Sequence, residues 1–144
     1  MKILGKLILV GSILFSGFSF AGSGKAIVPH WGAQSGKASY IFLSNITDHD
    51  VIVSITYYGK NGAKLSPSTY TNFTNSNTQL SARSSRYVSI QPGAWDYGFA
   101  TIEWINLLDE DDTVALIAHG FRVVTATTST RSDFSVQINN GLPF

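Results

Sequence analysis

The dominant pattern along this chain is an alternation of apolar and polar residues with a period of two, which is typical of half-buried β-strands. No segment after the first twenty-one residues has the convincing period of an amphipathic helix. Strands are predicted at Ala38–Ser44, Val51–Tyr58, Ala63–Leu65, Ser84–Ile90, Gly98–Ile105, Thr113–Thr127 and Asp133–Asn139.

Turn-forming residues separate these segments. Asn45–Asp50 connects the first two strands, because Asn and Asp side chains bond nearby backbone and tolerate left-handed conformations. Asn61-Gly62 supplies the positive φ angles of a tight hairpin. Ser66–Ser76 is rich in Ser, Thr and Asn and is predicted to be the longest loop. A glycine at 120 leaves two interpretations of Thr113–Thr127: one long strand bent at Gly120, or a hairpin that turns there.

The spacing of strands and turns predicts an all-β fold, an antiparallel β-sandwich of immunoglobulin-like kind with about seven or eight strands. A closed barrel is the alternative. The antibody cysteine pair is absent, so the true immunoglobulin family is not implied. The predicted core consists of Val51, Val53, Ile55, Ala100, Ile102, Trp104, Leu116, Val123, Phe134, Val136 and Ile138.

The amino-terminal segment has a different pattern. Lys2 and Lys6 precede the apolar run Leu7–Phe15, and a stretch of small residues ends in Ser19-Phe20-Ala21. This is the order of a cleaved signal peptide, residues 1–21, which leaves a single domain at 22–144 that begins with Gly22. A membrane anchor is the alternative, but the run is short of the roughly 20 apolar residues that a spanning helix needs. We therefore expect a secreted protein, periplasmic or extracellular, without a membrane span after cleavage.

Charge and cysteine content narrow the function classes. Loss of Lys2 and Lys6 leaves eight of the 10 basic residues against 9 acidic ones, a net charge of −1. That balance argues against nucleic acid and against electrostatic binding to an anionic membrane. The chain has no cysteine, so its stability comes from packing rather than disulfides. With the short signal, this fits a protein of the bacterial envelope.

One loop carries the clearest candidate for ligand binding. Trp95, Asp96 and Tyr97 stand between glycines at 93 and 98, so two aromatic rings flank a carboxylate. A ring can stack on the apolar face of a sugar while Asp96 bonds its hydroxyls. In the alternative, which we favour, Trp95 or Tyr97 folds over the end of the sandwich as a plug. The segment Pro29-His30-Trp31-Gly32 has a similar composition and is a more ambiguous candidate for ligand binding.

Metal and catalytic motifs are weaker. Asp48-His49-Asp50 and the acidic run Asp109–Asp112 offer ligands to a cation, but the run lacks the alternating spacing and glycine of a calcium loop. The sequence leaves calcium binding there open, and we assign no metal and no cofactor. No nucleophile elbow, zinc-protease helix or cysteine nucleophile is present, so we assign no catalytic residue.

Together these observations predict a secreted, non-enzymatic binding or structural module. It would act by self-association as a homo-oligomer, or by contact with another envelope protein. Low net charge and few lysines along the sheet edges favour self-association. The alternative function is carbohydrate binding by the loop around Trp95 and Tyr97.

Overall fold

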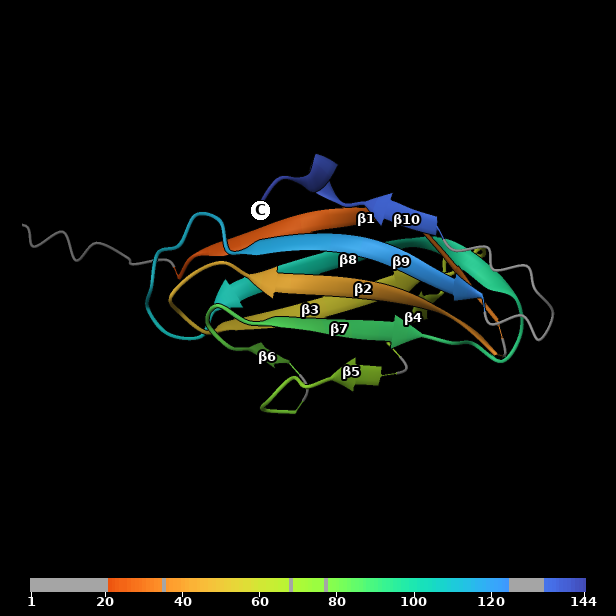
Figure 1. Ribbon diagram of the computed structural model, residues 1–144, viewed down its shortest axis with the longest axis horizontal. Helices are drawn as coiled ribbons and strands as arrows, with labels where there is room; N and C mark the ends of the chain where they lie inside the picture. The colour runs from red at the N-terminus through yellow and green to blue at the C-terminus, as the bar shows by residue number, and fades with distance from the viewer. Residues whose placement is uncertain (1–20, 35, 68, 77, 125–133) are drawn as a thin grey trace, which may run out of the picture.

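The computed structural model describes residues 21–34, 36–67, 69–76, 78–124 and 134–144 (Figure 1). Over these residues the chain forms β-strands and a single 3₁₀ turn, η1 (Asn139–Gly141), so the predicted all-β class is confirmed. The predicted signal peptide lies outside the described residues except for Ala21.

The strands form two antiparallel sheets. The first sheet has the order β1-β8-β3-β4, with β6 also paired to β3. Its strands are β1 (Ser23–Ala33), β8 (Asp96–Asn106), β3 (Val51–Tyr58), β4 (Lys64–Leu65) and β6 (Gln79–Leu80). The second sheet has the order β10-β9-β2-β7-β5. Its strands are β10 (Phe134–Gln137), β9 (Leu116–Val124), β2 (Lys37–Asn45), β7 (Ser85–Ile90) and β5 (Thr69–Thr71).

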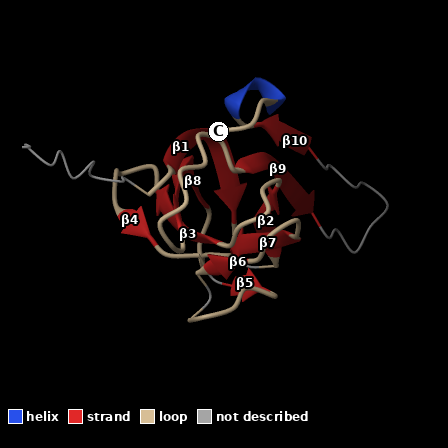
Figure 2. Ribbon diagram, turned by 90° about the vertical axis from the view of Figure 1, so that its left-hand side faces the viewer, coloured by secondary structure: helices blue, strands red, loops and turns tan. Residues whose placement is uncertain are grey.

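The two sheets enclose one core, and Figure 2 shows them as two layers. Alternate residues of each central strand are buried, as the period of two requires. Eight of the predicted core residues are buried, namely Val51, Val53, Ile55, Ala100, Ile102, Trp104, Leu116 and Ile138. Val136 is half-buried, and the side chains of Val123 and Phe134 lie outside what the structure describes.

Most predicted strands are confirmed within a few residues, and two parts of the prediction are wrong. β1 was not predicted, because Ala26-Ile27-Val28 is a continuous apolar run followed by Pro29, and the two-residue strand β6 was also missed. The predicted loop Ser66–Ser76 contains the short strand β5, which pairs with β7. The described part of the chain therefore holds ten strands rather than seven or eight, three of them only two or three residues long.

Gly120 lies inside β9 and pairs with Ile41 on one side and Val136 on the other without a register shift. The hairpin interpretation of His119-Gly120 is therefore wrong. A β-carbon at residue 120 would lie 3.2 Å from Cβ of Val136, so a larger residue would crowd β10.

The connections between strands gather at two ends of the sheets. The polar end comprises loops 46–50, 81–84 and 107–115, next to the start of β1. The aromatic end comprises the turns at 59–63 and 91–95, next to the end of β1. The candidate functional groups divide between these ends and the free edge of β1.

Candidate functional site

The predicted ligand loop lies at the aromatic end, where Asp96 begins β8. Its Oδ1 accepts hydrogen bonds from the backbone N–H of Lys60 at 3.0 Å and of Tyr97 at 2.9 Å. These bonds, the one from Lys60 first, hold the pKa of the Asp96 carboxyl below its ordinary value. Asp96 thus fastens its loop to the turn between β3 and β4, which uses one of the oxygens that a sugar hydroxyl would need.

Trp95 and Tyr97 are both partly open to solvent, with 42% and 44% of their surface exposed. Their ring centroids are 6.0 Å apart and the ring planes are tilted by 37°, so the rings do not form one flat platform. The guanidinium carbon of Arg122 lies 5.0 Å from the centre of the Trp95 ring, a cation–π distance. Trp95 therefore bridges from the first sheet to β9 of the second while part of its surface remains open.

Trp31, the aromatic residue of the second candidate segment at 29–32, belongs to the core. It is 2% exposed, and its Nε1 donates to the carbonyl oxygens of Tyr58 and Phe99 at 3.1 and 3.0 Å. Its ring packs edge-on against Tyr57 with a centroid distance of 5.4 Å. The Trp31 side chain is therefore committed to these packing and backbone contacts, so the segment 29–32 has a structural role.

Aromatic residues also cover the outer face of the second sheet. Phe42 and His119 are stacked with centroids 5.1 Å apart and planes within 7°, and Tyr87 packs on the other side of Phe42 at 5.4 Å. Parallel rings at this centroid distance are stacked with a lateral offset, because coplanar rings would collide at their edges. The three rings therefore pack against one another across β9, β2 and β7 rather than presenting flat faces on which a ligand could stack.

The free edge of β1 is a feature that the sequence did not reveal. β1 pairs with β8 on one side and has no partner strand on the other among the described residues. Ile27 on this strand is 58% exposed, and Lys25 bonds Glu103 of β8 at 2.6 Å. That ion pair neutralises the charge beside the edge.

A groove runs along this edge. It has a volume of about 430 Å³ and is lined by Lys25, Ala26 and Ile27 of β1 and by Asn139 of η1. In the sequence, Ala26, Ile27 and Val28 form a short apolar run that ends at Pro29, without the alternation that predicts a half-buried strand. Extended backbone with an adjoining groove is the arrangement that binds a further β-strand.

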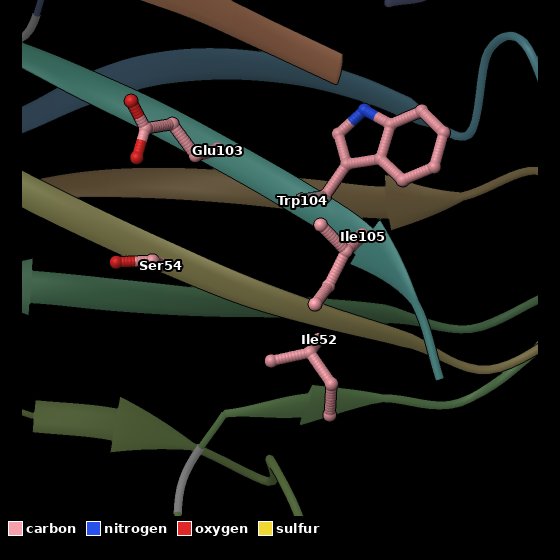
Figure 3. A pocket seen from close by; sticks show the side chains of 5 residues that line it. All are labelled: Ile52, Ser54, Glu103, Trp104 and Ile105. Carbon is pink, nitrogen blue, oxygen red and sulfur yellow. The ribbon is translucent and has the colours of Figure 1, made fainter. Parts of the chain in front are cut away.

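The outer face of the first sheet continues this surface. A shallow depression of about 180 Å³ is lined by Ile52, Ser54, Glu103, Trp104 and Ile105. Figure 3 shows Ile52 of β3 beside Ile105 of β8, with Ser54 and Glu103 further along the same two strands. Ile105 is 52% exposed. The depression is small and largely apolar, so it suits an apolar side chain of a partner better than a polar ligand.

The polar end holds the acidic and histidine residues that suggested a metal. His49 Nδ1 lies 2.9 Å from Oδ2 of Asp112, and this hydrogen bond raises the pKa of the imidazole above its ordinary value. Asp48 pairs with Arg83, and Asp50 accepts a bond from the N–H of Ala82 at 2.8 Å. Across the described ranges, no group of three or more His, Cys, Asp or Glu side chains is arranged to hold a metal ion.

Comparison with known proteins identifies the fold without a function. No protein-family model and no curated protein sequence matches the chain. A crystal structure of Thermotoga maritima 1070 is similar in fold, with a TM-score of 0.54 over 80% of this chain and 92% of that one. The two sequences are 11% identical, so the likeness supports the all-β fold alone. Within the described residues, we find no helix of the length and apolar character needed to cross a membrane.

Proposed function

We propose that the chain is a secreted, non-enzymatic module with an immunoglobulin-like sandwich fold, which acts by self-association through the free edge of β1. The export signal at residues 1–21 supports a periplasmic or extracellular location. The observation that carries the proposal is the edge of Ser23–Val28, which has no partner strand within the part of the chain that the structure describes and has an exposed isoleucine and a groove beside it.

The lengths of the sheet edges single out β1. The other edge strands of the described sheets have four residues or fewer, whereas β1 has eleven. Pro29 and the register shift that follows it blunt the second half of β1, as edge strands commonly require. The open part is therefore Ser23–Val28, long enough for a row of backbone hydrogen bonds.

The chemistry of this edge favours a second copy of the chain as its partner. Two copies related by a two-fold axis can pair β1 antiparallel to β1, because each offers the same alternating donors and acceptors. Lys25 is neutralised by Glu103 within its own chain, so the edges do not repel each other. The net charge of −1 on residues 22–144 leaves little overall repulsion.

Sedimentation velocity on the exported protein and two charge variants tests this proposal. Ile27→Lys places a charge on the contact, whereas Leu108→Lys adds the same charge at a residue that is 67% exposed in loop 107–115. We expect Ile27→Lys to weaken self-association at least about tenfold, equivalent to about 1.4 kcal/mol, and Leu108→Lys to leave it unchanged. Equal effects of the two variants would refute the role of β1.

Carbohydrate binding by Trp95, Asp96 and Tyr97 is the second candidate function. The exposure of both rings favours it, while their 37° tilt and the two backbone bonds to Asp96 favour the plug. Trp95→Ala should lower the melting temperature by a few degrees, corresponding to about 1 kcal/mol for the lost cation–π and packing contacts. Carbohydrate binding would be favoured instead if the wild type binds a glycan on an array, and Trp95→Ala loses that binding without any loss of stability.

A further inference from the structure

We infer that the acidic loop at the polar end is a receptor for the α-ammonium group that signal cleavage creates at Gly22. This inference rests on the processing after Ala21 that the proposed function includes. It assigns a role to the acidic run Asp109–Asp112, which neither self-association nor sugar binding explains.

Both backbone groups of Gly22 are already bonded. Its nitrogen donates to the carbonyl oxygen of Glu110 at 2.7 Å, and its carbonyl oxygen accepts from the N–H of Asn106 at 2.8 Å. Residue 22 thus extends the β1–β8 ladder by one position and joins it to loop 107–115. The nitrogen that cleavage would convert to an ammonium therefore already lies at the loop.

The fit at this position requires glycine. A β-carbon on residue 22 would lie 2.1 Å from the backbone oxygen of Asp112 and 2.6 Å from its nitrogen, both far inside contact distance. The obstacle is backbone, which cannot swing aside as a flexible side chain can. The residue that processing is predicted to expose is therefore one that can lie directly against the loop.

The loop that Gly22 meets is acidic, and Asn106, whose backbone N–H bonds the Gly22 carbonyl, has a buried side-chain amide without a partner among the described residues. Glu110 and Asp112 meet Gly22 through their backbone atoms. Each also carries a carboxylate: that of Glu110 accepts from the N–H of Leu108 at 3.1 Å and that of Asp112 bonds His49 at 2.9 Å, while Asp109 and Asp111 belong to the same acidic run. The Asn106 side chain is 3% exposed, and its amide atoms have no hydrogen-bond partner among the described residues. An ammonium brings three donors and a positive charge to a place where an uncut chain brings one neutral N–H.

The charge balance of the receptor includes one basic group from another element. His49, in the loop between β2 and β3, donates from Nδ1 to the Asp112 carboxylate at 2.9 Å. A protonated imidazole would compete with the ammonium for this carboxylate more strongly than a neutral one, because it adds a positive charge to the hydrogen bond. The ammonium contact should therefore be strongest above the pKa of His49 and below that of the amine itself.

The test measures the pKa of the Gly22 amine in the exported protein. Selective ¹³C labelling of glycine lets the α-carbon of Gly22 report the titration of the amine by NMR and leaves its three N–H donors intact. We expect a pKa about one unit above the ordinary 7.7–8.0 of an α-amino group. Asp112→Asn should reverse about half of this shift or more, while Asp109→Asn and Asp111→Asn, which remove the same charge from residues that do not touch Gly22, should change it less.

Gly22→Ala supplies a second, independent readout. Its β-carbon should displace the amine from the loop, return the pKa to the ordinary range and raise hydrogen exchange across 107–115 at least threefold. If the amine pKa lies in the ordinary range and does not change in Asp112→Asn, the proposed receptor role is wrong, even if cleavage occurs after Ala21. The same pKa measurement can be made on a chain cut before Gly22 by a site-specific protease, which makes the test of the receptor independent of export. An exported product that begins at another residue would show that the predicted cleavage after Ala21 is wrong.

Discussion

The two ends of the molecule are held together by different chemistry. At the polar end, side chains bond backbone: the Asn45 amide donates to the carbonyl of His49 at 2.8 Å, and its oxygen accepts from the N–H of Thr47 at 3.0 Å. At the aromatic end, rings pack across strands, with Trp31 against Tyr57 and Arg122 over Trp95. Each end also has one buried tryptophan that bonds a carbonyl, so both ends share an apolar anchor and differ in what surrounds it.

The comparison teaches where charge can act. The polar end contains the acidic run and His49, so its stability should depend on pH. The stability of the aromatic end should depend on how closely its side chains and strands pack. The predictions below separate the two, beginning with the anchors.

Removal of either anchor should cause the largest loss of stability. Trp104 is 1% exposed and donates to the carbonyl of Phe144 at 2.9 Å, and Trp31 is 2% exposed. Trp104→Ala and Trp31→Ala should each cost about 3–5 kcal/mol, as for other large buried aromatics. Urea denaturation measures this, with Trp95→Ala as the exposed control. A loss below about 1 kcal/mol at either position would contradict the assigned core.

Gly98→Ala should produce the next largest effect, confined to the aromatic end. A β-carbon there would lie 1.9 Å from the carbonyl oxygen of Tyr58, so β3 and β8 would have to separate. We expect a cost of about 3 kcal/mol from this overpacking. Gly93→Ala is the matched control, because its β-carbon would meet nothing within 4 Å. Comparable melting temperatures for both variants would show that β8 is not packed as described.

Asn45→Ala should disturb the polar end to a smaller extent. The side chain is 3% exposed and also lies 3.3 Å from the carbonyls of Leu80 and Ser81. Its removal leaves several buried carbonyls unpaired, which should lower the free energy of unfolding by about 2 kcal/mol. Ser44→Ala, one residue earlier and half-buried on the outer face, should cost much less. Denaturation curves that superimpose for the two variants would argue against the Asn45 network.

The smallest effect concerns pH. The folded protein raises the pKa of His49, because the imidazole bonds Asp112. A raised pKa means that the pair stabilises the fold below the unfolded pKa of about 6.5, and that this stabilisation is lost as pH rises through the folded value. His49→Gln should therefore lower the melting temperature more at pH 5.5 than at pH 8.5, with His119→Gln as the comparison. A difference that is the same at both pH values would exclude the ion pair.

The sequence predicted what depends on local residue type. The alternation in Val51–Tyr58 identified both the strand and its buried face, and Asn45–Asp50 was recognised as a turn because its side chains can bond backbone. The same reasoning identified Trp104 as core. These features depend on neighbours within a few residues, so a single sequence is enough to find them.

The features that were missed depend on contacts between distant residues. β1 escaped notice because its apolar run Ala26–Val28 does not alternate and is followed by Pro29; only pairing with β8 shows that Ser23–Ala33 is a strand, and its part Ser23–Val28 has no second partner strand among the described residues. Likewise, the contact of Arg122 with Trp95 joins two sheets, and Gly22 meets Glu110 across the chain. Register decides these contacts, and no residue pattern in one strand specifies its register with another.

The central claim is that the free edge of β1 joins copies of the chain. Static light scattering of the exported protein over a dilution series from high to low micromolar concentration tests it most directly. The account predicts an average mass above that of the monomer at the highest concentration, which falls toward the monomer on dilution and stays at the monomer throughout for Ile27→Lys. A monomer mass for the wild type at every concentration would contradict it.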